Sequence, residues 1–179
     1  MSENKDVYAQ AKSQMRLSER IAAALPGFRG YKEKELRRES DKLVRNNLTL
    51  KLSKDKDNVR SIAQKIADKR YLDVISDIDR LTAKMDRITE KVNHASYGYA
   101  GFYNIVKIKE EQLDRMITFD NQLLDEVNAL TASIEDLKTQ LLSNNFSNLK
   151  DKIQTIVDKF ELLEDTFDKR EQVILGVTL

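Results

Sequence analysis

The residues best suited to bind an anion form a basic row in the first quarter of the chain. Lys34, Arg38 and Lys42 recur at every fourth position, so a helix places them on one face, with Arg29 leading in and Arg45 beside them. Like charges at this spacing repel each other, which favours an external anion such as phospholipid, phosphate or an acidic partner. We predict that Arg29, Lys34, Arg38 and Lys42 bind an anionic partner, with a plain solvated helix face as the alternative.

A second group of chemically capable residues is the aromatic and glycine-rich stretch SYGYAGFYN at residues 96–104. One interpretation is a cleft in which tyrosine hydroxyls orient a small ligand. The other is a packed turn, with glycines where the backbone needs positive φ or close approach. We favour a structural aromatic turn, which would comprise Tyr97, Gly98, Tyr99, Gly101, Phe102 and Tyr103.

Catalytic and metal-binding patterns are weak. His94 is the one histidine, and Glu90 lies four residues before it, whereas di-metal bundles need paired Glu-x-x-His units. We expect His94 to end a helix, where a cation is mildly favoured. Without cysteine, a histidine pair or a phosphate-binding glycine loop, we expect neither an enzyme nor a cofactor or metal. Nucleic acid is not expected either, since Glu33, Glu35 and Glu39 interrupt the basic residues.

The composition indicates long helices. Charged residues make up 34% of the 179, with five glycines, one proline and no tryptophan, as in rod-like helical proteins. The start is polar, and no apolar run approaches the roughly 20 residues needed to cross a bilayer. We therefore expect a cytoplasmic protein, with a peripheral position at the inner face of the membrane left open.

Heptad patterns predict which faces are buried. Apolar residues recur every seven positions with a second series three positions later, the a and d pattern of coiled coils. The first seam comprises Tyr71, Val74, Ile78, Leu81, Met85, Ile88, Val92 and Ala95; the second, Leu113, Met116, Leu123, Val127, Leu130, Ile134, Leu137 and Leu141; the third, Phe146, Leu149, Ile153, Ile156, Phe160, Leu163 and Phe167. An earlier helix from about Tyr31 to Ile66 should kink or turn near residues 53–58 or near Lys69.

The break between the first two seams decides the fold. They are in phase, as one long helix would be, but Gly98 and Gly101 each cost about 1 kcal/mol in a helix. We predict that the chain folds back there, so that helices on either side pair antiparallel. The predicted fold is all-α: an elongated antiparallel bundle or coiled coil of four to five helices. Residues 1–30 would form an amphipathic helix and a PGFRG turn, and residues 31–179 the bundle.

Three further features of the sequence each allow two interpretations. Asp120 falls on the second seam and either fixes register inside the core or turns toward solvent. The apolar ending VILGVTL, residues 173–179, either docks on the bundle or binds a partner. The first helix, with Lys12, Arg16 and Arg20 on its polar side, either packs on the bundle or contacts anionic membranes weakly.

Two stretches resemble a family of prokaryotic all-helical proteins without an assigned activity. They are LPGFRGYKEKELRRESDKLVR, residues 25–45, and SYGYAGFYNIVKIKEEQLDRM, residues 96–116. These correspond to an early GYRGYKEKE-RRE-D element and a mid-chain YGYAG element. In overall build the chain also resembles membrane-associated coiled coils of the phage-shock-protein type. These resemblances imply a cytosolic helical protein with a role in the response to membrane stress.

Together these observations predict a non-enzymatic scaffold or adaptor that acts through helix-mediated contact with protein partners. Self-association into a homo-oligomer is expected, because heptad seams seek partner helices. Two alternatives stay open. One is a peripheral membrane-binding stress protein that uses the first helix and the basic row, and the other is a helical bundle that binds a small ligand.

Overall fold

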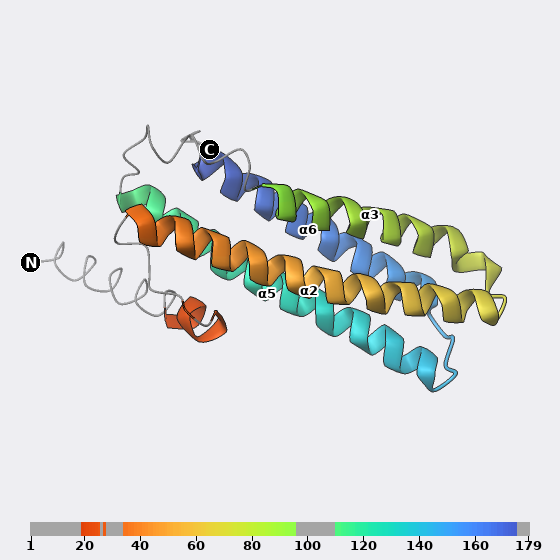
Figure 1. Cartoon of the computed structure of the whole chain (residues 1–179). Coiled ribbons are helices and arrows are strands. Elements are labelled where there is room, and N and C mark those ends of the chain that lie inside the picture. The colour runs from red at the N-terminus through yellow and green to blue at the C-terminus, as the bar shows by residue number, and fades with distance from the viewer. Residues whose placement is uncertain (1–18, 26, 28–33, 96–109, 175–179) are drawn as a thin grey trace, which may run out of the picture.

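The chain folds into an elongated bundle of long helices in the computed structural model (Figure 1). The structure describes residues 19–25, 27, 34–95 and 110–174. Within them α2 spans Lys34–Asp68, α3 spans Ile75–His94, α5 spans Glu110–Leu142 and α6 spans Leu149–Ile174, and a short 3₁₀ turn, η1, spans Leu72–Val74. No strand occurs in these ranges, and the predicted all-α bundle is confirmed.

The turn between α2 and α3 is a Schellman motif. The amide of Arg70 donates to the carbonyl of Ala67 at 2.9 Å, and the amide of Tyr71 donates to the carbonyl of Ile66 at 3.1 Å. Arg70 takes the left-handed conformation, with φ 57°, that this motif requires. The turn predicted near Lys69 is therefore confirmed, whereas α2 runs unbroken through residues 53–58, the alternative position.

The turn between α5 and α6 repeats this geometry. The amide of Asn144 donates to the carbonyl of Leu141 at 3.0 Å, and the amide of Asn145 to that of Gln140 at 3.1 Å. Asn144 has φ 55°, a conformation that asparagine tolerates better than most residues. This turn begins with the residues Ser143, Asn144 and Asn145. α2–α3 and α5–α6 are thus two helical hairpins with the same kind of turn.

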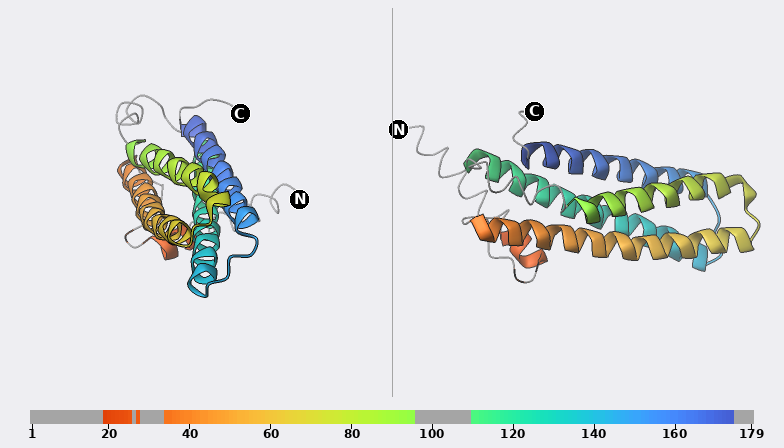
Figure 2. Two further views of the ribbon diagram at one scale, coloured as in Figure 1. Left: turned by 90° about the vertical axis from the view of Figure 1, so that its right-hand side faces the viewer. Right: turned by 45° about the horizontal axis from the view of Figure 1, so that its top comes forward.

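The two hairpins lie side by side with their turns at the same end (Figure 2). Lys51 on α2 contacts Asn128 on α5, and Arg87 on α3 contacts Glu164 on α6; in both pairs the partners are 77 residues apart. Lys84 and Glu161, also on α3 and α6, keep the same separation, and Asn58 on α2 contacts Lys138 on α5 at a similar separation of 80 residues. A constant separation along two helices means that they run in the same direction. Therefore α2 is parallel to α5 and α3 is parallel to α6.

This arrangement shows where the chain reverses its direction. Both α3 and α5 pack against α2 and α6, and α3 runs opposite to α5 across the bundle. The chain therefore folds back between α3 and α5, and the single long helix is ruled out. The predicted direct pairing of these two helices is wrong, because they lie diagonally and not as neighbours. The aromatic turn at residues 96–104 falls outside the described residues and stays a prediction.

The heptad seams form one continuous hydrophobic core. Nearly every seam residue in the described ranges is buried, from Val74 to Val92, from Met116 to Leu141 and from Leu149 to Phe167. Two assignments need correction at the hairpin turns. Tyr71 precedes η1 and is 41% exposed, and Phe146 lies in the loop before α6, although its side chain still packs, partly buried, against the core. Both residues follow a left-handed residue that ends the preceding helix, so the heptad phase does not govern them.

The end of the first predicted helix joins the core. Residues 19–24 are helical, and Ile21 and Leu25 are buried with the core residues of the bundle. Arg20 Nη2 contacts both carboxylate oxygens of Asp125 on α5 at 2.8 Å. Of the two interpretations of this helix, its described part therefore supports packing on the bundle.

Candidate functional site

The structure places one member of the predicted basic row at a hollow between α2 and α3. This hollow, which we call the α2–α3 pocket, has a volume of about 460 Å³. Its lining residues come from one face of α2 and the last turn of α3; they are Lys42, Arg45, Asn46, Thr49, Val92, Asn93 and His94. Arg29 and the side chains of Lys34 and Arg38 lie outside the described residues. Of the predicted row, Lys42 is therefore the residue that can be placed.

Two cationic residues on α2 line the α2–α3 pocket. Lys42 is exposed, whereas Arg45 is 8% exposed and so holds its charge in the pocket wall. His94 is the last residue of α3, which confirms its predicted place at a helix end, and its Nε2 lies 2.9 Å from a carboxylate oxygen of Glu90. Among the described residues no three histidines or acids gather in a way that could hold a metal ion.

A second surface with distinct chemistry lies at the end of the bundle where the turns are. The rings of Tyr71 and Phe146 stack with centroids 4.3 Å apart and planes 9° from parallel, joining one hairpin turn to the other. Leu72 and Leu142, on the same two turn regions, are 71% and 63% exposed. We call these four residues the tip surface. Sequence reasoning missed it, because both aromatics had been assigned to buried seams.

The interface between α3 and α6 is bordered by opposite charges. Arg87 Nη2 lies 2.7 Å from a carboxylate oxygen of Glu164, and Lys91 Nζ lies 3.7 Å from the other. Lys84 pairs with Glu161, and Lys91 also pairs with Asp168. α3 supplies the cations and α6 the anions. Each exposed pair contributes little, but their common sign pattern favours one register of the two hairpins.

Asp120 lies inside the core and forms an ion pair there. It is fully buried on α5, and Arg170 Nε on α6 donates to its Oδ1; Arg170 is 2% exposed. Of the two interpretations of Asp120, the buried one is confirmed and the solvent-facing one is wrong. Arg170 was missed, because an arginine within a charged segment such as DKREQ normally predicts a solvated face.

A buried acid, Asp55, and a half-buried acid, Glu126, also have hydroxyl partners. Thr131 Oγ1 on α5 donates to Asp55 Oδ2 on α2 at 2.7 Å, and Thr166 Oγ1 on α6 donates to Glu126 Oε1 on α5 at 2.9 Å. Burial raises the pKa of both the Asp55 and the Glu126 carboxyl, and each hydroxyl contact opposes that rise only in part. These two contacts connect neighbouring helices, α2 with α5 and α5 with α6.

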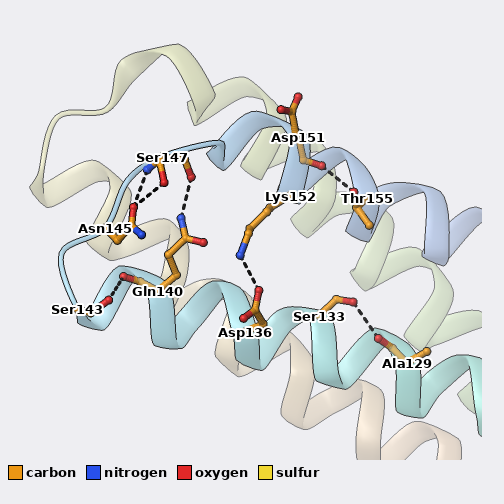
Figure 3. Close-up of polar contacts among 10 residues, drawn as sticks. All are labelled: Ala129, Ser133, Asp136, Gln140, Ser143, Asn145, Ser147, Asp151, Lys152 and Thr155. Carbon is orange, nitrogen blue, oxygen red and sulfur yellow. Dashed lines mark hydrogen bonds and ion pairs between the residues drawn. The ribbon is translucent and has the colours of Figure 1, made fainter.

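A shallow groove of about 550 Å³ follows the contact between α5 and α6 (Figure 3). Its polar residues bond within the bundle. Lys152 Nζ lies 2.6 Å from Asp136 Oδ2 across the groove, and Ser133 Oγ donates to the carbonyl of Ala129 at 2.9 Å. Thr155 Oγ1 likewise donates to the carbonyl of Asp151. The groove therefore presents small side chains and satisfied polar groups, which makes it a weaker candidate than the α2–α3 pocket.

The fold defines a helical-bundle protein of the coiled-coil kind, and comparison with known proteins finds distant relatives. The chain is 25% identical over 113 residues to nuclear distribution protein nudE-like 1-A of Xenopus laevis and to nudE-like 1 of Xenopus tropicalis. Each match covers 62% of this chain and 32% of the relative, so the chain spans about a third of the length of these proteins.

Other comparisons give no further assignment. No protein-family model matches the chain, and no solved structure matches it significantly. The resemblance to prokaryotic helical proteins and to the phage-shock-protein type therefore stays a prediction. None of the helices in the described ranges has the length and apolar character of a membrane span.

Proposed function

We propose that this protein is a non-enzymatic scaffold or adaptor of the cytoplasm that binds protein partners through its helical surfaces. The observation that carries the proposal is the tip surface, where Leu72 and Leu142 are 71% and 63% exposed at the same end of the bundle as the Tyr71–Phe146 stack. Large exposed apolar side chains at one end of a rod can mark a protein-binding surface. The length of the bundle would separate the tip surface from the opposite end of the molecule.

Because the heptad seams are packed inside the bundle, partners would have to bind at other surfaces. The described seam residues are buried against helices of the same chain, so they are not free to recruit partner helices. Self-association, which the seams alone had predicted, would therefore also need surface residues. We propose that homo-oligomers, if formed, use the tip surface, in competition with other partners. The matches to the nudE-like proteins, which are named for nuclear distribution, support a role other than catalysis.

The membrane alternative receives less support. Ile21 and Leu25 from the first predicted helix are buried in the bundle, and Arg20 contacts Asp125. Those side chains are the ones that a weakly bound amphipathic helix would present to lipid. We therefore keep peripheral membrane contact as the secondary candidate, to be tested by flotation of the full chain with anionic vesicles at low salt.

Site-specific photocrosslinking in living cells tests the proposed function. A benzophenone amino acid replaces Leu72 or Leu142 at the tip, and Leu50 on α2 or Leu162 on α6 as matched controls, since both controls are also exposed leucines. We expect both tip positions to crosslink to the same protein, identified by mass spectrometry, and the controls to give much weaker adducts. Equal adducts at all four positions, or none at the tip, would contradict the proposal.

A further inference from the structure

We propose that residues 19–25 are a displaceable cover on the bundle, and that a helix of a protein partner with the same pattern of side chains binds the surface beneath them. This inference rests on the proposed protein-binding function and adds a second, regulated site. We call residues 19–25 the cover segment. Drawn in red, it lies beside α2 in the half of the bundle away from the hairpin turns, so the site is separate from the tip surface (Figures 1 and 2).

Few contacts hold the cover segment in place. Ile21 and Leu25 are 0% and 3% exposed, whereas the other side chains of the segment are exposed. Arg20 pairs with Asp125 of α5, but both side chains are more than half exposed, so solvent weakens this contact. A helix as short as residues 19–24 is not stable without packing. The cover segment should therefore open locally while the long helices remain folded.

The surface beneath the cover segment is more buried than its place on α5 predicts. Asn121 and Leu124 are 5% and 4% exposed, although neither belongs to the heptad seam of α5. Asn128, at the heptad position of Asn121 one repeat later, is exposed. Asn121 lies one helical turn before Asp125, so the contact of Arg20 with Asp125 places the cover segment against this part of α5. Displacing the segment would expose an apolar surface around Leu124, bordered by the carboxylate of Asp125.

The cover segment is the template for the partner. It contacts the bundle through a basic residue, an apolar residue directly after it and a second apolar residue four positions later, which are Arg20, Ile21 and Leu25. The four-residue spacing places both apolar side chains on one helix face, as in amphipathic helices that bind apolar surfaces. Arg20 Nη2 contacts both carboxylate oxygens of Asp125 at 2.8 Å, so the site favours a partner helix with arginine at this position and disfavours one with an acid there.

The attachment of the cover segment to the chain makes the site regulated. Because the segment belongs to the same chain, its local concentration at the surface is high, and a partner must compete with it. Gly27, two residues after the segment, has φ 91°, a conformation that glycine adopts without strain. The chain therefore turns here and does not continue as one helix into α2, so the segment can leave the bundle without unwinding α2.

Peptide binding to the full chain tests the proposal. The probe is a fluorescent peptide with the sequence of residues 15–27, and a control peptide carries Ile21→Asp and Leu25→Asp. The proteins are the natural chain and a full-chain variant with the same two substitutions, which releases the cover segment. By fluorescence anisotropy we expect the probe to bind the released variant at least tenfold more tightly than the natural chain, where the chain's own segment competes. The control peptide should bind neither protein.

Charge reversals locate the binding. In the released variant, Asp125→Arg should weaken the probe fivefold or more, and a probe that carries Arg20→Glu should recover most of the loss. Asp158→Arg, at an exposed acid on α6, is the matched control and should leave the affinity nearly unchanged. Circular dichroism checks that each variant keeps its helices.

Hydrogen exchange of the natural chain gives a second test that does not depend on any variant. The amide of Leu25 donates to the carbonyl of Ile21 at 2.9 Å. If the cover segment opens locally, this amide should exchange at least a hundredfold faster than the amides of Leu130 and Ile134 in the core of α5.

Several results would overturn the assignment. They are equal affinity of the probe for the natural chain and the released variant, an equal effect of the two charge reversals, or exchange at Leu25 as slow as in the core of α5. Light scattering identifies the occupant, since natural-chain dimers that the probe dissociates would show that a second copy exchanges its cover segment, and not that a partner binds.

The outcome is separable from that of the crosslinking experiment. Tip adducts without binding of the probe would reject this site alone, and binding of the probe without tip adducts would reject the proposed role of the tip surface.

Discussion

Arg170 on α6 donates from Nε to Oδ1 of Asp120 on α5, and both side chains are buried in the core between the two helices of one hairpin. A paired charge at this depth contributes little net stability but is costly to break, because removing one partner leaves the other charge desolvated. The pair therefore specifies how α5 and α6 pack more than it strengthens the packing.

Asp120→Ala should lower the free energy of unfolding by about 3–5 kcal/mol, because Arg170 is then left buried without its carboxylate. The double variant Asp120→Leu/Arg170→Met should recover most of this loss. Urea unfolding of the natural chain, of Asp120→Ala and of the double variant measures both effects. A loss below about 1 kcal/mol for Asp120→Ala would show that the pair is not desolvated as described.

Asp55→Asn should raise the stability of the protein at neutral pH. Burial raises the pKa of Asp55 in the folded state above its value in the unfolded chain, and its buried Oδ1 makes no hydrogen bond within the described residues. The folded state therefore holds the proton more tightly. The stability that protonation contributes is present at acid pH and is lost as the pH rises through the folded-state pKa.

The measurement is urea unfolding of the natural chain and of Asp55→Asn from pH 7 down to pH 4. We expect the advantage of the variant to shrink as the pH falls, since Asp55 becomes neutral in the natural chain as well. Glu126→Gln should also be more stable than the natural chain at neutral pH, with an advantage that shrinks as the pH falls, because burial also raises the pKa of Glu126. A variant that is less stable at every pH, with an unchanged pH slope, would contradict this explanation.

Arg70→Gly should stabilise the α2–α3 turn. Arg70 has φ 57°, a conformation that costs a side chain roughly 1–2 kcal/mol and that glycine adopts freely. Glycine also raises the conformational entropy of the unfolded chain, which offsets part of this gain. We therefore expect a net increase of up to about 1 kcal/mol in the free energy of unfolding. Arg60→Gly, at an exposed position inside α2, is the matched control and should lose about 1 kcal/mol. Thermal unfolding in which both variants lose stability would argue against this turn.

Tyr71 and Phe146 should couple the two hairpin turns energetically. Their rings stack at 4.3 Å, and such pairs contribute about 0.5–1.5 kcal/mol beyond the area they bury. A double-mutant cycle with Tyr71→Ala and Phe146→Ala measures this coupling. The same cycle with Leu72→Ala in place of Tyr71→Ala serves as a control and should give a coupling near zero. Equal couplings in both cycles would show that the ring stack has no specific role.

The heptad pattern predicted the helices and their buried faces because a seven-residue repeat records which side of a helix avoids water. It could not predict which helices are neighbours, since every seam is similarly apolar. That choice depends on contacts such as Arg87–Glu164 and Lys51–Asn128, whose partners are 77 residues apart. Charged residues of this kind are common on every helix, so the pairs were not recognisable in the sequence.

The candidate site was predicted only in part for a similar reason. Lys42 belonged to a visible basic row, but the α2–α3 pocket also needs Asn93 and His94 from the end of α3. Phe146 was instead assigned to a helix to which it does not belong. It keeps the heptad phase of α6, yet Asn144 and Asn148 take positive φ on either side of it, so the residue lies in a loop.

The side-by-side, parallel arrangement of the two hairpins is the central claim, and spin-label distances test it most directly. The chain has no cysteine, so labels can be attached at two chosen positions. The first pair is Ser76→Cys with Thr155→Cys, and the second is Ala83→Cys with Leu162→Cys, all at exposed sites or sites near the surface on α3 and α6. The second pair is one heptad further along both helices.

If α3 and α6 are parallel neighbours, the two pairs should give nearly the same short distance. If the helices ran in opposite directions, the axial separation would change by about 21 Å between the pairs, which follows from the helical rise of 1.5 Å per residue. Equal short distances would support the account, and distances that differ by about that amount would contradict it.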